Sequence, residues 1–240
     1  MERIDYPAKE SWKAILERPT QSVNDIEDAV DTIFTEVKEK GDEAITAYTK
    51  KFDQVELESF LVTQEEIQNA IKEVPKQLQE AISLAKNNIE RFHAAQKTEK
   101  VNLETMPGVQ CWQEKRPIQK VGLYIPGGTA PLFSTILMLA VPAQLAGCSE
   151  IVLCTPPNKE GKINPAILYS AQLCGVTKIF KVGGIQAIAG MTFGTASITK
   201  VYKIFGPGNQ YVTVAKQLAT KYGVAIDMPA GPSELLVVAD

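Results

Sequence analysis

Residues 121–147, VGLYIPGGTAPLFSTILMLAVPAQLAG, read as a short apolar strand, a proline-glycine-glycine turn and a long apolar helical segment. Strand, glycine turn and helix in this order form the layout of a nucleotide site. Neither G-x-G-x-x-G nor G-x-x-x-x-G-K-[ST] occurs anywhere in the chain, so the standard Rossmann and P-loop fingerprints are both missing. This turn could therefore bind a ligand other than those that the two standard fingerprints recognise.

The same unit recurs through the rest of the chain. Short β-rich runs alternate with helical segments of about ten to fifteen residues, which predicts parallel strands with right-handed crossovers. The predicted strands lie at 121–125, 150–154, 178–182, 200–205, 224–228 and 234–240, and the predicted helices after the first at 164–175, 185–193 and 209–223. We therefore predict an α/β fold, with residues 120–240 as a Rossmann-like domain built on a parallel sheet.

Residues 1–119 are predicted as a helical N-terminal region and part of a first α/β domain. Ile26, Val30, Ile33 and Val37 recur at three- and four-residue steps, which indicates an amphipathic helix ended by Gly41.

Further along, Thr63 and Glu66 have the spacing of a capping box, and Pro75 separates that helix from the next. From about residue 76 to 96, one apolar face is expected to contain Ile82, Ala85, Ile89 and Phe92. The run VQCWQEKRPI, residues 109–118, alternates like a half-exposed strand.

Composition favours small-molecule chemistry. The chain has 240 residues, 45% of them apolar, and a net charge of −3 from 25 basic and 28 acidic residues, which gives no electrostatic footprint for nucleic acid or an anionic membrane. The longest apolar run is too short and too polar to span a bilayer. The four cysteines, without an apolar leader segment, indicate reduced thiols and a cytoplasmic protein.

Glycine- and proline-bearing turns follow the predicted strands. Because carboxyl ends of parallel strands meet at one edge of a sheet, we expect these turns to lie together and to form a ligand site. Glycine permits close backbone approach, and the helix behind each turn presents free N–H groups to phosphate or carboxylate oxygens. The turns are IPGGTAP at 125–131, VGGIQA at 182–187, FGPGNQY at 205–211 and MPAGPSE at 228–234.

These turns in this order carry a family resemblance. Together with their flanks, 122–148, 181–195, 203–216 and 225–234, they strongly resemble histidinol dehydrogenases from about Ser22 to Asp240. The resemblance implies an NAD-dependent, zinc-containing homodimer that oxidises L-histidinol through L-histidinaldehyde to L-histidine. It also implies incomplete Rossmann-like halves with an architecture related to aldehyde dehydrogenases.

Four residues match the family's contact positions. The resemblance implies that Tyr124, Gln186 and Asn209 contact NAD and that Ser233 contacts the substrate. Each residue also has a plain structural reading: a core-edge aromatic for Tyr124, an exposed helix residue for Gln186, a helix cap for Asn209 and a turn former for Ser233.

No catalytic residue and no metal ligand is expected in this chain. The family's zinc ligands, general-base histidine and glutamate lie beyond the PAGPSE segment, so they are expected beyond residue 240. The chain then corresponds to an N-terminal portion of the enzyme and is expected to be nearly inactive alone. The single histidine, His93, is predicted to be a packing or interface residue.

Three alternatives stay open at this point. The chain could be an aldehyde-dehydrogenase-like oxidoreductase with Cys148 or Cys154 as nucleophile, a binding module that lost the reaction, or an α/β domain whose turns bind nothing. Apolar stripes left uncovered in the first hundred residues and along 234–240 predict self-association, with a homodimer as the simplest assembly.

Overall fold

The computed structural model describes residues 4–16, 23–127, 131–176 and 178–228. The elements are, in chain order, η1 (Lys9–Ser11), α1 (Trp12–Ile15), α2 (Val23–Lys40), α3 (Asp42–Asp53), α4 (Gln64–Glu73), α5 (Lys76–Ala94), β1 (Val101–Met106), β2 (Val109–Gln113), β3 (Lys120–Tyr124), α6 (Phe133–Ala146), β4 (Glu150–Thr155), α7 (Pro165–Leu173), β5 (Lys178–Lys181), α8 (Gly184–Phe193), β6 (Lys203–Phe205), α9 (Gln210–Lys221) and β7 (Ala225–Ile226).

The main sheet has five parallel strands in the order β5-β4-β3-β6-β7. Tyr124 at the end of β3 pairs with Cys154 on one side, and Leu123 pairs with Phe205 on the other. The predicted α/β fold with a parallel sheet is confirmed. The predicted strand at 234–240 lies outside the described residues.

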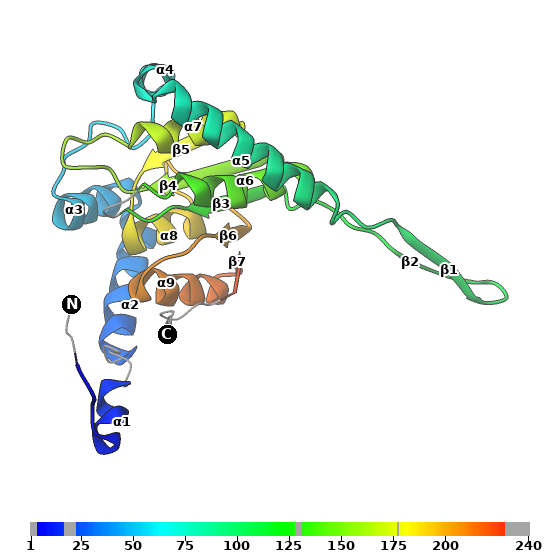
Figure 1. Cartoon of the computed structure of the whole chain (residues 1–240), viewed down its shortest axis with the longest axis horizontal. Coiled ribbons are helices and arrows are strands. Elements are labelled where there is room, and N and C mark those ends of the chain that lie inside the picture. The colour runs from blue at the N-terminus through cyan, green and yellow to red at the C-terminus, as the bar shows by residue number, and fades with distance from the viewer. Residues whose placement is uncertain (1–3, 17–22, 128–130, 177, 229–240) are drawn as a thin grey trace.

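Helices cover both faces of this sheet (Figure 1). Because side chains of a strand alternate between faces, Leu123 and Leu153 point into the core under α4, α5, α6 and α7. Tyr124 and Cys154 point into the opposite core, under α2, α3, α8 and α9. Helices from residues 1–119 thus share both cores with helices that follow; the division at residue 120 stays a prediction.

The local signals of the N-terminal helices are confirmed. Helix α2 is followed by Gly41 at a positive φ of 56°, which favours glycine, and the apolar stripe of the helix is buried. Helix α4 begins with the capping box: the N–H of Glu66 donates to the Thr63 hydroxyl at 3.1 Å, and the N–H of Thr63 donates to the Glu66 carboxylate at 2.8 Å.

The predicted burial of one residue on the apolar face of α5 is wrong. Ile82 is buried, and Ala85 and Ile89 pack against the core, but Phe92 is 64% exposed. The end of α5 that carries Phe92 extends beyond the body of the molecule (Figure 1). The apolar face of the helix is therefore longer than the core against which it packs.

The strand predicted at 109–118 exists only over its first half, as β2 (Val109–Gln113), and its partner β1 was not predicted. The two strands form an antiparallel hairpin that projects from the body beyond α5 (Figure 1). All residues of both strands are exposed, including the large side chains of Leu103, Met106 and Trp112. The alternation therefore reflects an arm whose two faces are both uncovered among the described residues.

Candidate functional site

The site region is the point where the sheet reverses its direction of growth. From β3 the chain adds β4 and then β5 on one side, and after α8 it returns to add β6 and β7 on the other side of β3. In open parallel sheets, ligands bind outside the carboxyl ends of strands at such a switch point. The ends of β3 and β6 carry the turns that begin at Ile125 and Gly206.

Gly206 brings these two turns into direct contact. Its φ is 137°, and a Cβ at this position would overlap the carbonyl oxygen of Tyr124. Only glycine fits both the backbone angle and the space, so the sequence of this turn is dictated by the closeness of β3 and β6.

Tyr124 lies inside the core at the end of β3. It is 4% exposed, and its hydroxyl accepts a hydrogen bond from the N–H of Gly184 at 3.0 Å. Burial raises the pKa of Tyr124 to about 12, the Gly184 bond lowers it partly, and the nearby Asp53 and Cys154 raise it further. The hydroxyl is therefore protonated at neutral pH and retains a proton to donate.

Gln186 is the most unusual side chain of the region. It is 1% exposed, yet neither its amide oxygen nor its amide nitrogen has a hydrogen-bond partner within the described chain. The side chain folds back over Gly184, where a Cβ would come within 2.9 Å of Oε1. Tyr124 and Gln186 therefore meet at Gly184, and the exposed-helix reading of Gln186 is wrong.

Asn209 stands at the start of α9. Its side-chain oxygen accepts a hydrogen bond from the N–H of Val212 at 3.0 Å, so it caps the helix, and the residue is exposed. The turn from Gly206 to Asn209 leads from the switch point to this cap. The remaining predicted site residue, Ser233, lies outside the described residues.

Asp53, at the end of α3, is a residue that sequence reasoning missed. One of its carboxylate oxygens is buried with no partner among the described residues, and burial raises its pKa to about 6. It lies close enough to Tyr124 to raise the pKa of that hydroxyl. Nothing in the sequence distinguishes Asp53 from other acidic residues at helix ends.

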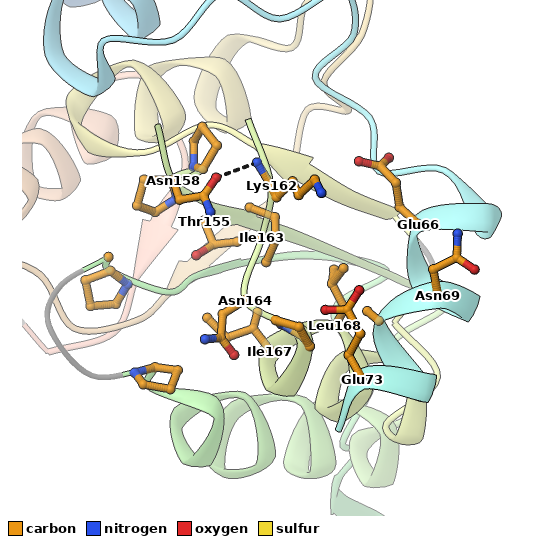
Figure 2. A pocket seen from close by; sticks show the side chains of 17 residues that line it. Glu66, Asn69, Glu73, Thr155, Asn158, Lys162, Ile163, Asn164, Ile167 and Leu168 are labelled. Carbon is orange, nitrogen blue, oxygen red and sulfur yellow. Dashed lines mark hydrogen bonds between the residues drawn. The ribbon is translucent and has the colours of Figure 1, made fainter. Parts of the chain in front are cut away.

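A cavity of about 550 Å³ opens beside the first turn, at the carboxyl ends of β3 and β4. Pro126 and Gly127 form one edge; Figure 2 shows Asn69 and Glu73 of α4 on one side and Thr155 and Asn164 on the other. Its lining residues are Glu66, Asn69, Ala70, Glu73, Pro126, Gly127, Pro131, Thr155, Pro156, Pro157, Asn158, Lys162, Ile163, Asn164, Pro165, Ile167 and Leu168.

The charges at this cavity are partly paired. Lys181, at the end of β5, contacts the Glu66 carboxylate at 2.6 Å. Burial alone would raise the pKa of Glu66, but Lys181 and Thr63 together outweigh burial and lower it. The carboxylate is therefore ionised at neutral pH and holds α4 against the end of β5.

The cysteines do not have the environment of nucleophiles. Cys154 is fully buried and burial raises its pKa, and burial also raises the pKa of the half-buried Cys148. An activated thiol needs a lowered pKa, so these surroundings argue against the cysteine-nucleophile alternative.

His93 is half-buried. Its Nδ1 is hydrogen-bonded with the Gln96 side chain at 2.7 Å, and its ring makes an edge contact with Phe92. Both contacts are with neighbouring residues at the end of α5, and the packing or interface role of His93 stays a prediction.

Metal-binding clusters and membrane-spanning helices are both absent from the described residues. No group of three or more His, Cys, Asp or Glu side chains among residues 4–16, 23–127, 131–176 and 178–228 could hold a metal ion. In the same part of the chain, no helix is both long and apolar enough to cross a membrane.

The five-stranded order with its switch point between β3 and β6, and the glycine turns that meet there, define an α/β protein of incomplete Rossmann type. The sequence profile of the histidinol dehydrogenase family matches residues 16–240. The chain belongs to the histidinol dehydrogenase family.

Individual relatives agree with this assignment. Histidinol dehydrogenase of Bacteroides thetaiotaomicron is 60% identical over all 240 residues, which span 56% of that protein. The Salmonella typhimurium enzyme is 53% identical over 234 residues, 96% of this chain and 53% of its own length. The crystal structure of histidinol dehydrogenase from Elizabethkingia anophelis superposes with a TM-score of 0.88 at 57% identity, over 95% of this chain and 52% of that one. The chain thus spans about half the length of these relatives.

Proposed function

We propose that this chain provides the NAD-binding part of an enzyme that oxidises L-histidinol through L-histidinaldehyde to L-histidine. The observation that carries the proposal is Gln186, a buried amide without a partner in the described chain, placed beside Gly184 at the carboxyl edge of the sheet. A buried polar group left unpaired costs about 1–3 kcal/mol, and a bound ligand that pairs the amide would offset this cost. Membership of the histidinol dehydrogenase family supplies the reaction class, an oxidation.

The residues present fit a dinucleotide. The Gln186 amide can both accept from and donate to it, and the Tyr124 hydroxyl, which already accepts from Gly184, can donate its proton. Asn209 stands exposed at the N-terminus of α9, where helix N–H groups favour phosphate oxygens. A bound NAD would supply the hydride acceptor for one oxidation, so the two oxidations need two NAD molecules in turn; this chain's part is to bind and orient each of them.

We also propose that Ser233 contacts the substrate, which rests on its match to the family motif. Zinc is a different case, because the described residues contain no set of side chains that could ligate it. We assign no residue of this chain to zinc.

Calorimetric titration of the 240-residue chain with NAD tests the proposal. We expect weak but saturable binding that is reduced in Gln186→Ala and unchanged in Gln68→Ala, which alters an exposed glutamine of α4. With L-histidinol and NAD supplied, we expect negligible NADH formation by the chain alone. Absence of any saturable NAD binding by the folded wild-type chain would defeat the proposal.

We further propose that the protein forms a homodimer in which the β1–β2 hairpin is covered. An isolated two-stranded hairpin is marginal in water, and this one exposes Leu103, Met106 and Trp112. A cytoplasmic location is proposed because all four cysteines are free thiols, as expected in a reducing compartment.

A further inference from the structure

The turn at the end of β6 is held by two charged residues from different elements. The N–H of Gly206 donates to the Asp227 carboxylate at 2.8 Å, and the carbonyl of Gly206 accepts from the Lys216 ammonium at 2.8 Å. Lys216 also donates to the second oxygen of Asp227. Both polar groups of one glycine are therefore bound by the two members of one ion pair.

In this Lys216–Asp227 clamp the lysine is buried, whereas the Asp227 side chain is 28% exposed. Lys216 lies on α9 and is 5% exposed, although lysine is among the residues least often found fully buried. Asp227 follows β7, and its own N–H donates to the carbonyl of Ile204 in β6 at 3.2 Å. The clamp thus joins β6, β7 and α9 at the residue where β6 gives way to the turn.

A general stabilising role does not explain this arrangement well. Removing the Lys216 ammonium from water costs several kcal/mol, and ion pairs with a buried member can often be replaced by apolar side chains without loss of stability. Here the pair is directed at a single glycine peptide, and that peptide lies against Tyr124 at the switch point. Since glycine loses more conformational freedom than any other residue when it is ordered, it gains most from an external restraint.

We propose that Lys216 and Asp227 are positioning residues that fix the turn from Gly206 to Asn209 for dinucleotide binding. The inference rests on the proposed NAD site and adds two residues to it that touch the turn and not the ligand. With the clamp in place, the turn is held in one conformation before the ligand arrives, so less ordering opposes binding. Without the clamp, the turn samples other conformations, and affinity for NAD falls.

The variants for the test are matched in pairs. Asp227→Asn keeps an acceptor for the N–H of Gly206, whereas Asp227→Ala removes it. Lys216→Met keeps the length of the side chain without its ammonium. Lys178→Met is the control, because Lys178 forms an ion pair with Glu150 at 2.6 Å at the opposite, amino-terminal edge of the sheet.

Two measurements on each folded variant test the positioning role. The first is the Kd for NAD, measured well below the melting temperature. The second is hydrogen exchange of the backbone N–H groups of residues 203–211 without NAD. We expect Asp227→Ala and Lys216→Met to raise the Kd at least tenfold and to speed exchange in this segment. Asp227→Asn should stay within about threefold of wild type, and Lys178→Met should change neither quantity.

The two proposals fail in different ways. Wild-type exchange at 203–211 and wild-type Kd in folded Asp227→Ala would overturn the positioning role, as would equal losses in Lys178→Met. If the wild-type chain binds no NAD, the proposed function fails, and the exchange measurement still tests whether the clamp restrains the turn. If Lys216→Met does not fold, the comparison of Asp227→Asn with Asp227→Ala tests the positioning role by itself.

Discussion

Gly184 donates its backbone N–H to the hydroxyl of Tyr124 across 3.0 Å, although the two residues are 60 positions apart in the chain. The first N–H groups of a helix have no partner within the helix, and here the end of β3 supplies one for α8. The bond fixes the start of α8 against the switch point, and it places Gln186, two residues further on, in the core. The first turn of α8 therefore carries both the bond to Tyr124 and the unpaired amide.

Tyr124→Phe removes this acceptor and leaves the N–H of Gly184 without its partner. We expect a loss of about 1–2 kcal/mol in the free energy of unfolding at pH 7, measured by urea denaturation. The effect also depends on pH. Because the pKa is raised to about 12 in the folded state, the unfolded state loses its proton first, and the advantage of wild type shrinks as pH rises from about 10 to 12. A difference that stays constant through that window would contradict the burial argument.

Asp53→Asn should stabilise the chain at neutral pH. Burial raises the pKa of Asp53 to about 6, whereas an aspartate in the unfolded state titrates near pH 4. Between about pH 4 and pH 6, the carboxyl is therefore protonated in the folded state and ionised in the unfolded state. Wild-type stability therefore falls as pH rises from about 4 to 6 and is then level. We expect a gain of about 1 kcal/mol at pH 7, reduced by partial exposure of the carboxyl, and no gain below pH 4. Urea denaturation from pH 3 to 8 measures the difference, and a gain at pH 3 as large as at pH 7 would count against it.

Local signals predicted much of this fold, and contacts between distant segments account for what they missed. The capping box at Thr63 and Glu66 is a matter of neighbouring residues, and the alternation of strands and helices fixes a parallel sheet. Gln186 could be assigned a ligand role only through a family resemblance. That its amide lacks partners depends on Gly184 and Tyr124, which no local pattern connects to it.

The hairpin illustrates a different limit. Pro107 and Gly108 between two alternating runs are a turn signal that could have identified β1. Its projection from the body could not be predicted, because alternation does not show whether either face of a strand is covered. The contacts of Lys216 and Asp227 with Gly206 could not be predicted either. A lysine in an amphipathic helix is ordinarily exposed, and only the fold brings the pair to Gly206.

Thr63→Ala tests the capping box. We expect a loss of about 1 kcal/mol, the usual effect of removing a helix cap, because the N–H of Glu66 loses its acceptor. Thr46→Ala is the matched control: Thr46 is exposed within α3, and its hydroxyl only donates back to Asp42 at 2.9 Å. Thermal melts compare the two, and equal losses would mean that the cap has no special effect.

Trp112→Glu tests whether the hairpin mediates association. The side chain is 63% exposed on β2, so the melting temperature of a dilute sample should change little. A buried charge at an interface is costly, and we therefore expect weaker self-association in sedimentation velocity at tens of micromolar. Gln110→Glu adds the same charge to the same strand at an exposed polar position and serves as control. Unchanged association in Trp112→Glu would remove the hairpin from the interface.

Gln186→Leu separates the demands of folding from those of ligand binding. Both amide atoms of Gln186 are buried without partners in the described chain, and Leu fills a similar space with no polar group to desolvate. We expect the free energy of unfolding without NAD to rise by about 1–3 kcal/mol. The same change removes the group proposed to pair with the dinucleotide, so NAD should no longer raise the melting temperature of the variant. Thermal melts with and without NAD give both quantities.

Gln144→Leu is the control: Gln144 is exposed, and its side-chain nitrogen donates to the carbonyl of Cys174. This variant should lose stability, by about 1 kcal/mol, and keep the response to NAD. Opposite signs for the two glutamines would mean that Gln186 is retained at the expense of stability, as expected of a residue that serves a ligand. If Gln186→Leu instead loses stability and still responds to NAD, the amide has a structural partner and the proposed site loses its main support.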